Sequence, residues 1–279
     1  MVSSTPRTAL VTGATSGIGW ATAKLLVERG YTVVGTSRDP SRIPAEDRID
    51  GVRYHDLDLR DLHSVDGLVG ALRAEQIAVD VLVNNAGESQ SGPLEEIPLP
   101  ALQRVMNVNV VAPVHLTQQL LPGMRQRGYG RVVMVGSMLA SFPFGYRSSY
   151  AASKAALRTF ATAARYEMAP YGVWLTTVEP GSIRTGISQR RTKYISETSP
   201  HAKPFARMLK TLDANEREGI APERVARTIL HAIEDDQPDP MYAVGSNAPV
   251  VSALRRALPR TAVERIVNRA YGMSKSPRA

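Results

Sequence analysis

The sequence predicts an α/β fold, a single domain built on a doubly wound parallel sheet of about seven strands. Short β-branched runs alternate with helical patterns, which is typical of parallel strands joined by crossover helices. The length of 279 residues suits one large domain, and the middle of the chain has no linker or low-complexity block. A glycine-rich turn at residues 12–19 joins the first predicted strand to the first predicted helix.

The predicted elements follow one another in regular order. We expect strands at residues 8–12, 31–36, 52–57, 79–83, 131–135, 173–178 and 241–244. We expect helices at residues 18–29, 62–74, 99–126, 149–171 and 222–234. Gly30 ends the first helix and Pro222 begins the last, positions that these residues favour. Pro113 predicts a bend in the long helix, because proline removes a backbone donor.

Two segments fall outside this alternation. Residues 182–219 are polar, basic and weakly periodic, and they follow a strand end, where binding loops of α/β sheets gather. We interpret them as a substrate lid, with a surface insertion as an equal alternative. Residues 250–271 mix apolar residues with arginines, which fits two short amphipathic helices separated by Pro259. We expect a helical flap packed on the sheet domain or on a subunit partner, in preference to a membrane-binding element.

Composition narrows the class of function. The chain has no cysteine, which excludes disulfides and cysteine nucleophiles. A net charge of +8 suggests nucleic-acid binding as one class of function. The basic excess, however, lies largely in residues 252–279, which carry seven basic residues and one acidic residue and contain no nucleic-acid-binding motif. We expect no nucleic-acid partner. The five histidines lack ligand spacing, so we expect no metal. We see no secretory signal and no membrane-spanning stretch, so a cytoplasmic protein is expected.

Tyr150 and Lys154 carry the sharpest chemical signal. They lie four residues apart on a predicted helix and therefore share a face. Free tyrosine has a pKa of about 10, and a nearby ammonium favours the phenolate, as general acid–base catalysis near neutrality requires. Ser137 lies upstream, after an apolar run, and can hold a carbonyl oxygen. Taken alone, the pair is more simply a surface tyrosine and lysine, and other motifs decide against that interpretation.

Three turns at strand ends supply those motifs. In the first, at residues 12–19, glycines let the backbone turn tightly and approach a pyrophosphate at a helix N-terminus. Residues 84–87, Asn-Asn-Ala-Gly, suit the close approach of a flat ligand. Residues 180–185 begin with Pro-Gly and offer a threonine hydroxyl. The second and third would each be ordinary turns in isolation.

In this order the motifs are specific, and the chain resembles the short-chain dehydrogenase/reductase family, in its TGxxxGxG and YxxxK subclass, over about residues 7–242. The resemblance is carried by Thr12, Gly13, Gly17, Gly19, Asp58, Leu59, Asn84, Asn85, Ala86, Gly87, Asn109, Ser137, Tyr150, Lys154, Pro180 and Gly181. It implies a Rossmann-type fold, with an NADP-binding catalytic domain at residues 1–246 and a basic helical extension at residues 247–279. It also implies a homodimer or homotetramer, formed through the helices at 99–126 and 149–171.

The resemblance further implies a role for each residue. Tyr150 would be the general acid in reduction and the general base in oxidation, while Ser137 positions the substrate oxygen. Lys154 would lower the pKa of Tyr150 and bind the nicotinamide ribose. Asn109 would support a proton relay to the lysine, and helix periodicity turns Asn107 another way. The cofactor-binding residues would be Gly13, Thr15, Ser16, Gly17, Ile18, Gly19, Ser37, Arg38, Asp58, Leu59, Asn85, Ala86, Gly87, Tyr150, Lys154, Pro180, Gly181, Ile183 and Thr185.

The end of the second strand predicts NADP(H) as the preferred cofactor. A carboxylate there would accept the ribose hydroxyls of NAD and repel a 2′-phosphate. Ser37 and Arg38 stand there instead, and a guanidinium suits a phosphate. Asp39 follows one residue later and favours NAD(H), because a shift by one residue would bring its carboxylate to the ribose. We expect it to pair with Arg38 or to cap the following helix.

The expected substrate is a small-molecule alcohol or carbonyl compound of hydrophobic character. Residues 138–147 are strongly apolar beside the predicted cleft, although ordinary core packing explains them equally well. A weak similarity to hydroxysteroid and retinol dehydrogenase-type members favours a steroid-, retinoid- or lipid-like compound. The alternative function is a non-catalytic NADP(H)-binding sensor, which a complete Ser137, Tyr150 and Lys154 set argues against. The basic C-terminus leaves peripheral membrane contact open.

Overall fold

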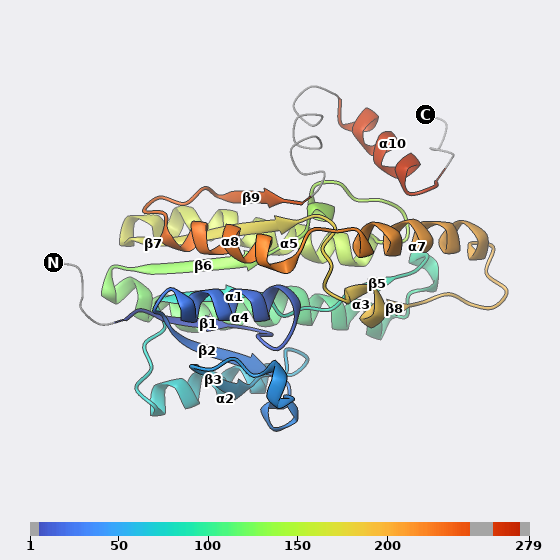
Figure 1. The fold of residues 1–279 in the computed structure, drawn as a ribbon. Coiled ribbons are helices and arrows are strands. Elements are labelled where there is room, and N and C mark those ends of the chain that lie inside the picture. Colours follow the sequence, from blue (N-terminus) through green and yellow to red (C-terminus); the bar gives the residue numbers. More distant parts are fainter. Residues whose placement is uncertain (1–5, 246–258, 274–279) are drawn as a thin grey trace.

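A seven-stranded parallel sheet forms the centre of the protein, with the strand order β3-β2-β1-β4-β6-β7-β9 (Figure 1). The structure, a computed structural model, describes residues 6–245 and 259–273. The chain runs outward from β1 to β3 and then returns to β4 on the other side of β1. The crevice at such a reversal, outside the carboxyl ends of the strands, is where α/β sheets bind ligands. The predicted fold class is confirmed.

The strands lie within two residues of their predicted bounds. They are β1 Thr8–Val11, β2 Thr32–Ser37, β3 Val52–Asp56, β4 Val81–Asn84, β6 Gly130–Val135, β7 Val173–Pro180 and β9 Met241–Val244. A second, two-stranded sheet pairs β5, Gln90–Ser91, with β8, Thr192–Lys193. The sequence analysis did not predict it, because strands of this length show no periodicity.

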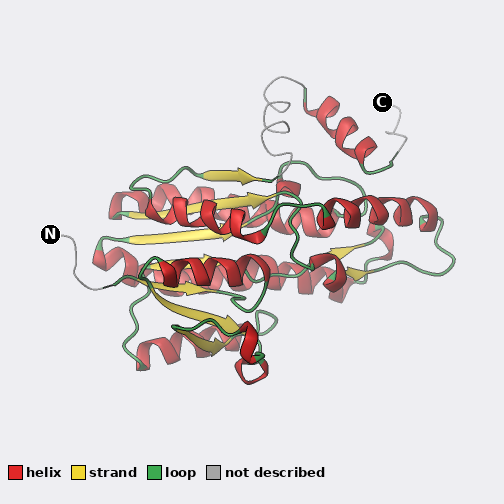
Figure 2. Cartoon of the chain, in the orientation of Figure 1, coloured by secondary structure: helices red, strands yellow, loops and turns green. Residues whose placement is uncertain are grey.

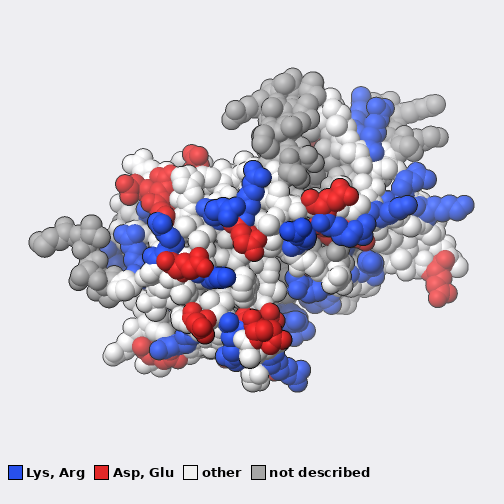
Figure 3. Space-filling view, in the orientation of Figure 1, with Lys and Arg blue, Asp and Glu red and all other residues white. Residues whose placement is uncertain are grey.

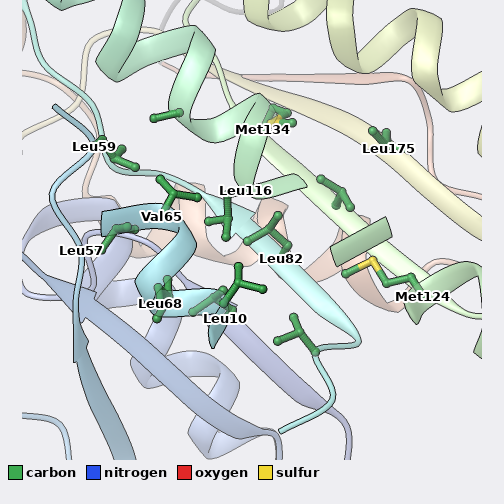
Figure 4. Close-up of a cluster of buried hydrophobic side chains, with 14 of the residues drawn as sticks. Leu10, Leu57, Leu59, Val65, Leu68, Leu82, Leu116, Met124, Met134 and Leu175 are labelled. Atoms are coloured by element: carbon green, nitrogen blue, oxygen red, sulfur yellow. The ribbon is translucent and has the colours of Figure 1, made fainter. Parts of the chain in front are cut away.

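Helices cover both faces of the large sheet (Figure 2). On one face lie α2 (Leu62–Ala74), α4 (Ala112–Arg127) and α5 (Ser148–Met168); on the other lie α1 (Gly17–Glu28) and α8 (Pro222–Glu234). Successive strand residues point to opposite faces, so the five inner strands β2, β1, β4, β6 and β7 contribute side chains to both cores. Figure 4 shows the core beneath the first group of helices, where Leu10, Leu82 and Leu116 meet.

The long helix predicted at residues 99–126 is interrupted. It comprises α3 (Leu99–Met106), a π-helical segment η4 (Asn107–Val111) and α4, with Pro113 in the first turn of α4. Single π-helical turns are rare and often stand at functional sites. Asn109 is fully buried and Asn107 is exposed, so the two asparagines face apart as predicted.

Residues 182–219 are more regular than the sequence indicated. They contain α6 (Ile187–Arg190) and the 16-residue helix α7 (Ala202–Arg217). The sequence did not predict α7, because this helix buries only a narrow stripe, Phe205, Met208 and Leu212, among many polar residues, and so its periodicity is weak. This helix forms a third apolar cluster at one end of the molecule.

The C-terminal helix α10, Arg260–Ala270, lies at the end of the molecule that carries α7 (Figure 1). Its Val267 packs against the third cluster. This agrees with the expected flap. The first of the two helices expected in residues 250–271 falls largely within residues 246–258, outside the described residues. Short 3₁₀ turns complete the chain: η1 Pro40–Arg42, η2 Ala45–Asp47, η3 Leu94–Glu96, η5 Met138–Ala140 and η6 Ala169–Tyr171.

The surface carries charges of both signs. Figure 3 shows basic and acidic side chains interspersed over the visible face. Within residues 6–245 and 259–273, every helix is too short or too polar to cross a membrane. No three histidine, aspartate or glutamate side chains in those ranges gather in a way that could hold a metal ion.

Candidate active site

A cavity of about 1150 Å³ lies along the carboxyl ends of the strands. Residues that follow β1, β2, β3, β4, β6 and β7 all contribute to its walls. Of the residues predicted for the site, only Gly19 and Asn109 do not line it. The fold therefore brings into one cavity motifs that are separated by more than a hundred residues of sequence.

The glycine-rich turn is held in a conformation that requires glycine. Gly13 and Gly17 have φ angles of 68° and 56°, in the left-handed region that other residues rarely adopt. Gly19 has another task, because a Cβ there would stand 2.1 Å from the carbonyl oxygen of Gly13. The turn leads into α1, whose exposed N–H groups and positive dipole end suit a phosphate.

The loop after β4 is tied directly to this turn. The Thr12 hydroxyl accepts hydrogen bonds from the backbone N–H groups of Asn85 and Ala86, at 2.9 and 3.0 Å. The Asn85 side chain donates to the Thr12 carbonyl at 2.9 Å. Asn85 thus fixes the two loops against each other, and Ala86 and Gly87 form the cavity floor between them.

At the far end of the cavity, Ser37 and Arg38 line the wall, whereas Asp39 does not. The Asp39 carboxylate caps η1 by accepting from the Ser41 N–H at 3.0 Å, and it pairs with Arg42 at 3.1 Å. The expected cap is confirmed, and the ion partner is Arg42. Asp39 is therefore engaged away from the cavity.

Asp58 and Leu59 lie at the same end, beside a second arginine that the sequence analysis missed. Arg60 lines the cavity and its guanidinium binds the Asp58 carboxylate through several hydrogen bonds. These hydrogen bonds are the main cause that lowers the pKa of Asp58. Arg60 and Arg38 make this end of the cavity basic.

Ser137, Tyr150 and Lys154 meet near the middle of the cavity. Tyr150 and Lys154 project from one face of α5, and Ser137 follows β6 at the start of η5. The Ser137 hydroxyl and the Tyr150 phenol form a hydrogen bond. Lys154 donates from Nζ to the Val135 carbonyl at 2.9 Å. All three side chains are buried, so their charges are weakly screened by water.

Burial dominates the proton equilibria of this group. It raises the pKa of Tyr150, and the largest opposing cause is the charge of Arg147, followed by the Ser137 hydrogen bond. Burial also lowers the pKa of Lys154 to about 8. The sequence analysis expected the lysine to lower the pKa of Tyr150. The structure instead shows a raised pKa and identifies Arg147, which the sequence analysis missed, as the first cation acting on the phenol.

Asn109 lies behind the cavity wall. Its amide oxygen accepts from the Glu88 N–H at 2.9 Å, and its amide nitrogen donates to the Glu88 carbonyl and to the Ser153 hydroxyl, each at 3.0 Å. A Cβ on Gly87 would stand 2.9 Å from Asn109 Oδ1 and 3.6 Å from Lys154 Nζ. Asn109 therefore borders the lysine site through the space that Gly87 leaves open.

The other half of the cavity has a largely apolar wall. As expected, the segment after Ser137 contributes Met138, Leu139, Phe142 and Phe144. From the segment interpreted as a substrate lid, α7 adds Leu212, Asn215 and Glu216. The C-terminal segment, which was not expected here, adds Val263, Ile266, Val267, Ala270 and Tyr271. The spacing of this last set, at i, i+3, i+4, i+7 and i+8, is that of one helix face. That signal was present in the sequence, but the sequence did not indicate which surface the face would cover.

The C-terminal helix is attached to the cavity rim by specific contacts. The Tyr271 ring stacks on Phe144 with centroids 3.8 Å apart and an angle of 13° between the planes. Asn268 accepts from the Gly145 N–H at 3.2 Å. Tyr271 also hydrogen-bonds to Asn215 and Ser182. Three parts of the rim are thereby joined to α10.

Comparisons with known proteins agree with this architecture. A family model described as short chain dehydrogenase matches residues 7–195. The 3-ketodihydrosphingosine reductase of Bacteroides thetaiotaomicron is 32% identical over 251 residues, covering 89% of this chain and 90% of that protein. Dehydrogenase/reductase SDR family member 7B of Xenopus laevis is 30% identical, with 90% and 78% covered.

Solved structures give the same result. A short-chain dehydrogenase from Streptomyces avermitilis is similar with a TM-score of 0.81 and 32% identity, covering 95% of this chain and 98% of that one. The closed form of a serine dehydrogenase complexed with NADP⁺ has a TM-score of 0.72 and 25% identity, covering 85% and 94%. The chain therefore belongs to the short-chain dehydrogenase/reductase family of oxidoreductases.

Proposed function

We propose that this protein is an NADP(H)-dependent alcohol dehydrogenase or carbonyl reductase, which interconverts a secondary alcohol and a ketone, or an aldehyde, by hydride transfer. The observation that carries the proposal is the meeting of Ser137, Tyr150 and Lys154 in the same cavity as the glycine-rich turn. A general acid, a hydrogen-bond donor for the reacting oxygen and a phosphate-binding turn are what this chemistry requires.

The residues of the cavity fit the cofactor. The glycine-rich turn, with Gly13 and Gly17 in the left-handed backbone conformation, and the start of α1 would hold the pyrophosphate. Arg38 would pair with a 2′-phosphate. Asp39 would not compete for the ribose, because Ser41 and Arg42 engage its carboxylate. NAD(H) remains the disfavoured alternative. When bound, the nicotinamide supplies or accepts the hydride.

Side chains of the protein would transfer the proton and bind the reacting oxygen of the substrate. In reduction, Tyr150 donates its phenolic proton to the substrate oxygen, which Ser137 holds by a hydrogen bond. Lys154, one helical turn along α5, would bind the nicotinamide ribose, and Asn109 would connect the lysine to a proton relay. In oxidation, the Tyr150 phenolate accepts the proton from the alcohol.

We further propose that the substrate is hydrophobic. The apolar faces of α10 and of the segment after Ser137 support this assignment. A relative whose name describes the reduction of a sphingoid ketone favours a lipid-like compound over a steroid or a retinoid. In this proposal, residues 1–246 form the catalytic domain, residues 182–219 the substrate lid and residues 247–279 a basic extension.

Turnover tests the assignment directly. NADPH consumption would be followed with a panel of aliphatic, steroid and retinoid ketones. Tyr150→Phe should lower kcat by about a hundredfold or more, because it removes the proton donor, while NADPH still binds. Tyr166→Phe, at an exposed position of the same helix, is the matched control and should keep full activity. Tight NADPH binding without turnover on any ketone would instead favour the sensor function, and full activity of Tyr150→Phe would contradict the mechanism.

We also propose a cytoplasmic homodimer or homotetramer. The helix α5 exposes Phe160 and Tyr166, and α3 exposes Leu99, which supports contact between copies along these helices. Light scattering coupled to size exclusion should give two or four times the mass of 30.3 kDa. A monomer at micromolar concentration would contradict this proposal.

A further inference from the structure

Arg147 is a buried cation beside the proposed proton donor. Its side chain is 2% exposed, and its Nη1 lies 3.0 Å from the Ser89 hydroxyl, 2.8 Å from the Gln90 carbonyl and 2.9 Å from the Ser91 hydroxyl. No carboxylate of the described chain forms an ion pair with it. A buried charge without a counter-ion is costly, so its position calls for a functional reason.

The guanidinium lies against the face of the Tyr150 ring. The Arg147 Cζ is 4.3 Å from the ring centroid, whereas the Lys154 Nζ is 6.0 Å away and donates to a backbone carbonyl. A guanidinium at this distance is attracted by the ring and restricts its rotation. A positive charge this close in a water-poor site also favours the phenolate.

The local fold is built to hold Arg147 in this place. Tyr146, the residue before it, has a φ of 64°, a conformation that residues other than glycine rarely adopt. The Tyr146 carbonyl accepts from the Gly92 N–H at 3.0 Å. These features turn Arg147 inward at the start of α5, toward the two-residue strand β5, which supplies two of its three acceptors.

We propose that Arg147 is a positioning residue for Tyr150: its guanidinium clamps the phenol ring in the cavity and stabilises the phenolate form. The effect on turnover rests on the proposed function, whereas the effect on the phenol itself does not. The segment after β7 takes part as well, because β8 pairs with the β5 strand that holds the guanidinium.

Other polar groups face Tyr150 and must be considered. Ser137 hydrogen-bonds to the phenol from the loop after β6, and Lys154 lies one turn along α5. Glu216 on α7 acts against the phenolate, and Arg191, before β8, acts in its favour. Arg191 forms ion pairs with Glu216 and with Asp213, which offset its charge. Arg147 forms no ion pair within the described residues, although Glu216 favours its charged form and Arg191 opposes it. Its charge is the largest influence that lowers the pKa of Tyr150.

A merely structural role, in which Arg147 braces β5 and nothing more, makes a different prediction. It would change the stability of the protein and leave the proton equilibrium of Tyr150 alone. The pKa of Tyr150 is therefore the measurement that separates the two roles.

The experiment titrates Tyr150 in the full-length protein labelled with ¹³C at tyrosine Cζ, with and without NADP⁺. The resonance would be assigned by its loss in Tyr150→Phe. Arg147→Gln should raise the pKa of Tyr150 by about one unit or more, and Arg147→Lys, which keeps the charge, should stay near the native value. Equal pKa values in the native protein and in Arg147→Gln would overturn the proposal.

A matched control comes from elsewhere in the fold. Arg131 is 6% exposed and its Cζ stands 4.7 Å from the centroid of Tyr129, at the end of β6 opposite the one that Ser137 follows. Arg131→Gln should lower the melting temperature and leave the titration of Tyr150 unchanged. If it shifted Tyr150 as far as Arg147→Gln does, the effect would be general and the proposal would fail.

Two further arms keep the test decisive. If Arg147→Gln does not fold, the double variant Ser89→Ala and Ser91→Ala removes two acceptors and keeps the charge. Loosening the clamp should then shift the pKa of Tyr150 upward, and an unchanged value would count against the proposal. If the native protein reduces no ketone, the proposed function fails, while the ¹³C titration still decides the role of Arg147.

Discussion

We expect a single residue, Arg38, to decide whether the protein prefers NADP(H) or NAD(H). It lines the cavity beside Ser37, while the neighbouring Asp39 is bound to Ser41 and Arg42. Arg38→Asp should weaken NADPH binding by about tenfold to a hundredfold, because a charge-assisted contact is lost and a repulsive charge is introduced. Fluorescence titration with NADPH and NADH measures both affinities.

The matched control is Arg48→Asp, which makes the same charge change in the same loop, at an exposed residue that neither lines the cavity nor pairs with Asp39. It should leave the preference for NADPH intact. Equal or stronger binding of NADH by the native protein would show that Arg38 does not select the cofactor.

At this scale, residues in local motifs were predictable and residues placed by tertiary contacts were not. Tyr150 and Lys154 were predicted from their helical spacing together with the motifs at the strand ends. Arg147 lies only three residues from Tyr150, yet its inward position depends on the φ of Tyr146 and on the strand β5. Neither feature leaves a pattern in the sequence.

Among the elements, α10 makes the most direct prediction about substrate binding. Ile266 lines the cavity and is 45% exposed, so a substitution there should not disrupt the core. Ile266→Asp should raise KM for a hydrophobic ketone by about tenfold or more, because a carboxylate would be desolvated by the substrate. Steady-state kinetics across ketones of increasing chain length would measure it, with the largest effect on the longest chains.

Arg265→Asp provides the control, since this residue is exposed on the same helix and does not line the cavity. It should leave KM unchanged, and NADPH binding should be unaffected in both variants. An unchanged KM in Ile266→Asp would mean that α10 does not contact the substrate.

The helix α7 shows where prediction from periodicity fails. Its buried stripe is only one residue wide at most turns, with Phe205, Met208 and Leu212 spaced among charged residues. The partner of this stripe is the cluster at the cavity rim, which includes Phe144 and Tyr271. A short stripe becomes recognisable only once the surface that it covers is known.

For the molecule as a whole, burial of Lys154 implies a dependence of stability on pH. Its pKa falls from the ordinary 10.5 to about 8 on folding, so between these values the unfolded chain holds a proton that the folded protein has released. Stability from this group therefore rises with pH through that window. Below about pH 8 the folded protein must bury the protonated lysine, which lowers the free energy of unfolding by about 3 kcal/mol, at ~1.4 kcal/mol per pKa unit.

Lys154→Met should therefore make the cofactor-free protein more stable than the native protein at pH 7, by up to about 3 kcal/mol, with the gain shrinking toward pH 10. Urea unfolding at several pH values would measure the difference in the free energy of unfolding. Lys203→Met, at an exposed position of α7, should show no such trend. A less stable Lys154→Met at pH 7 would contradict this account.

The architecture was predictable from the alternation of strands and helices, because a parallel sheet covered on both faces has few other sequence patterns. The position of the C-terminal segment was not. Its amphipathic pattern favours a protein surface over a membrane but does not say which surface, and the contacts of Tyr271 with Phe144, Asn215 and Ser182 show where it lies.

The placement of α10 has a consequence for how this chain could be re-engineered. The family model ends at residue 195, and the turn, the phenol and the lysine all precede that point. Much of the apolar wall comes after it, from α7 and α10. We therefore expect the residues of the proposed reaction to precede much of the wall that would select the substrate. Between α7 and α10 lie α8 and β9, which belong to the core and to the central sheet, so α7 and α10 are the parts to exchange. Replacing these two helices with those of a relative should alter which ketones are accepted and leave the cofactor site unchanged.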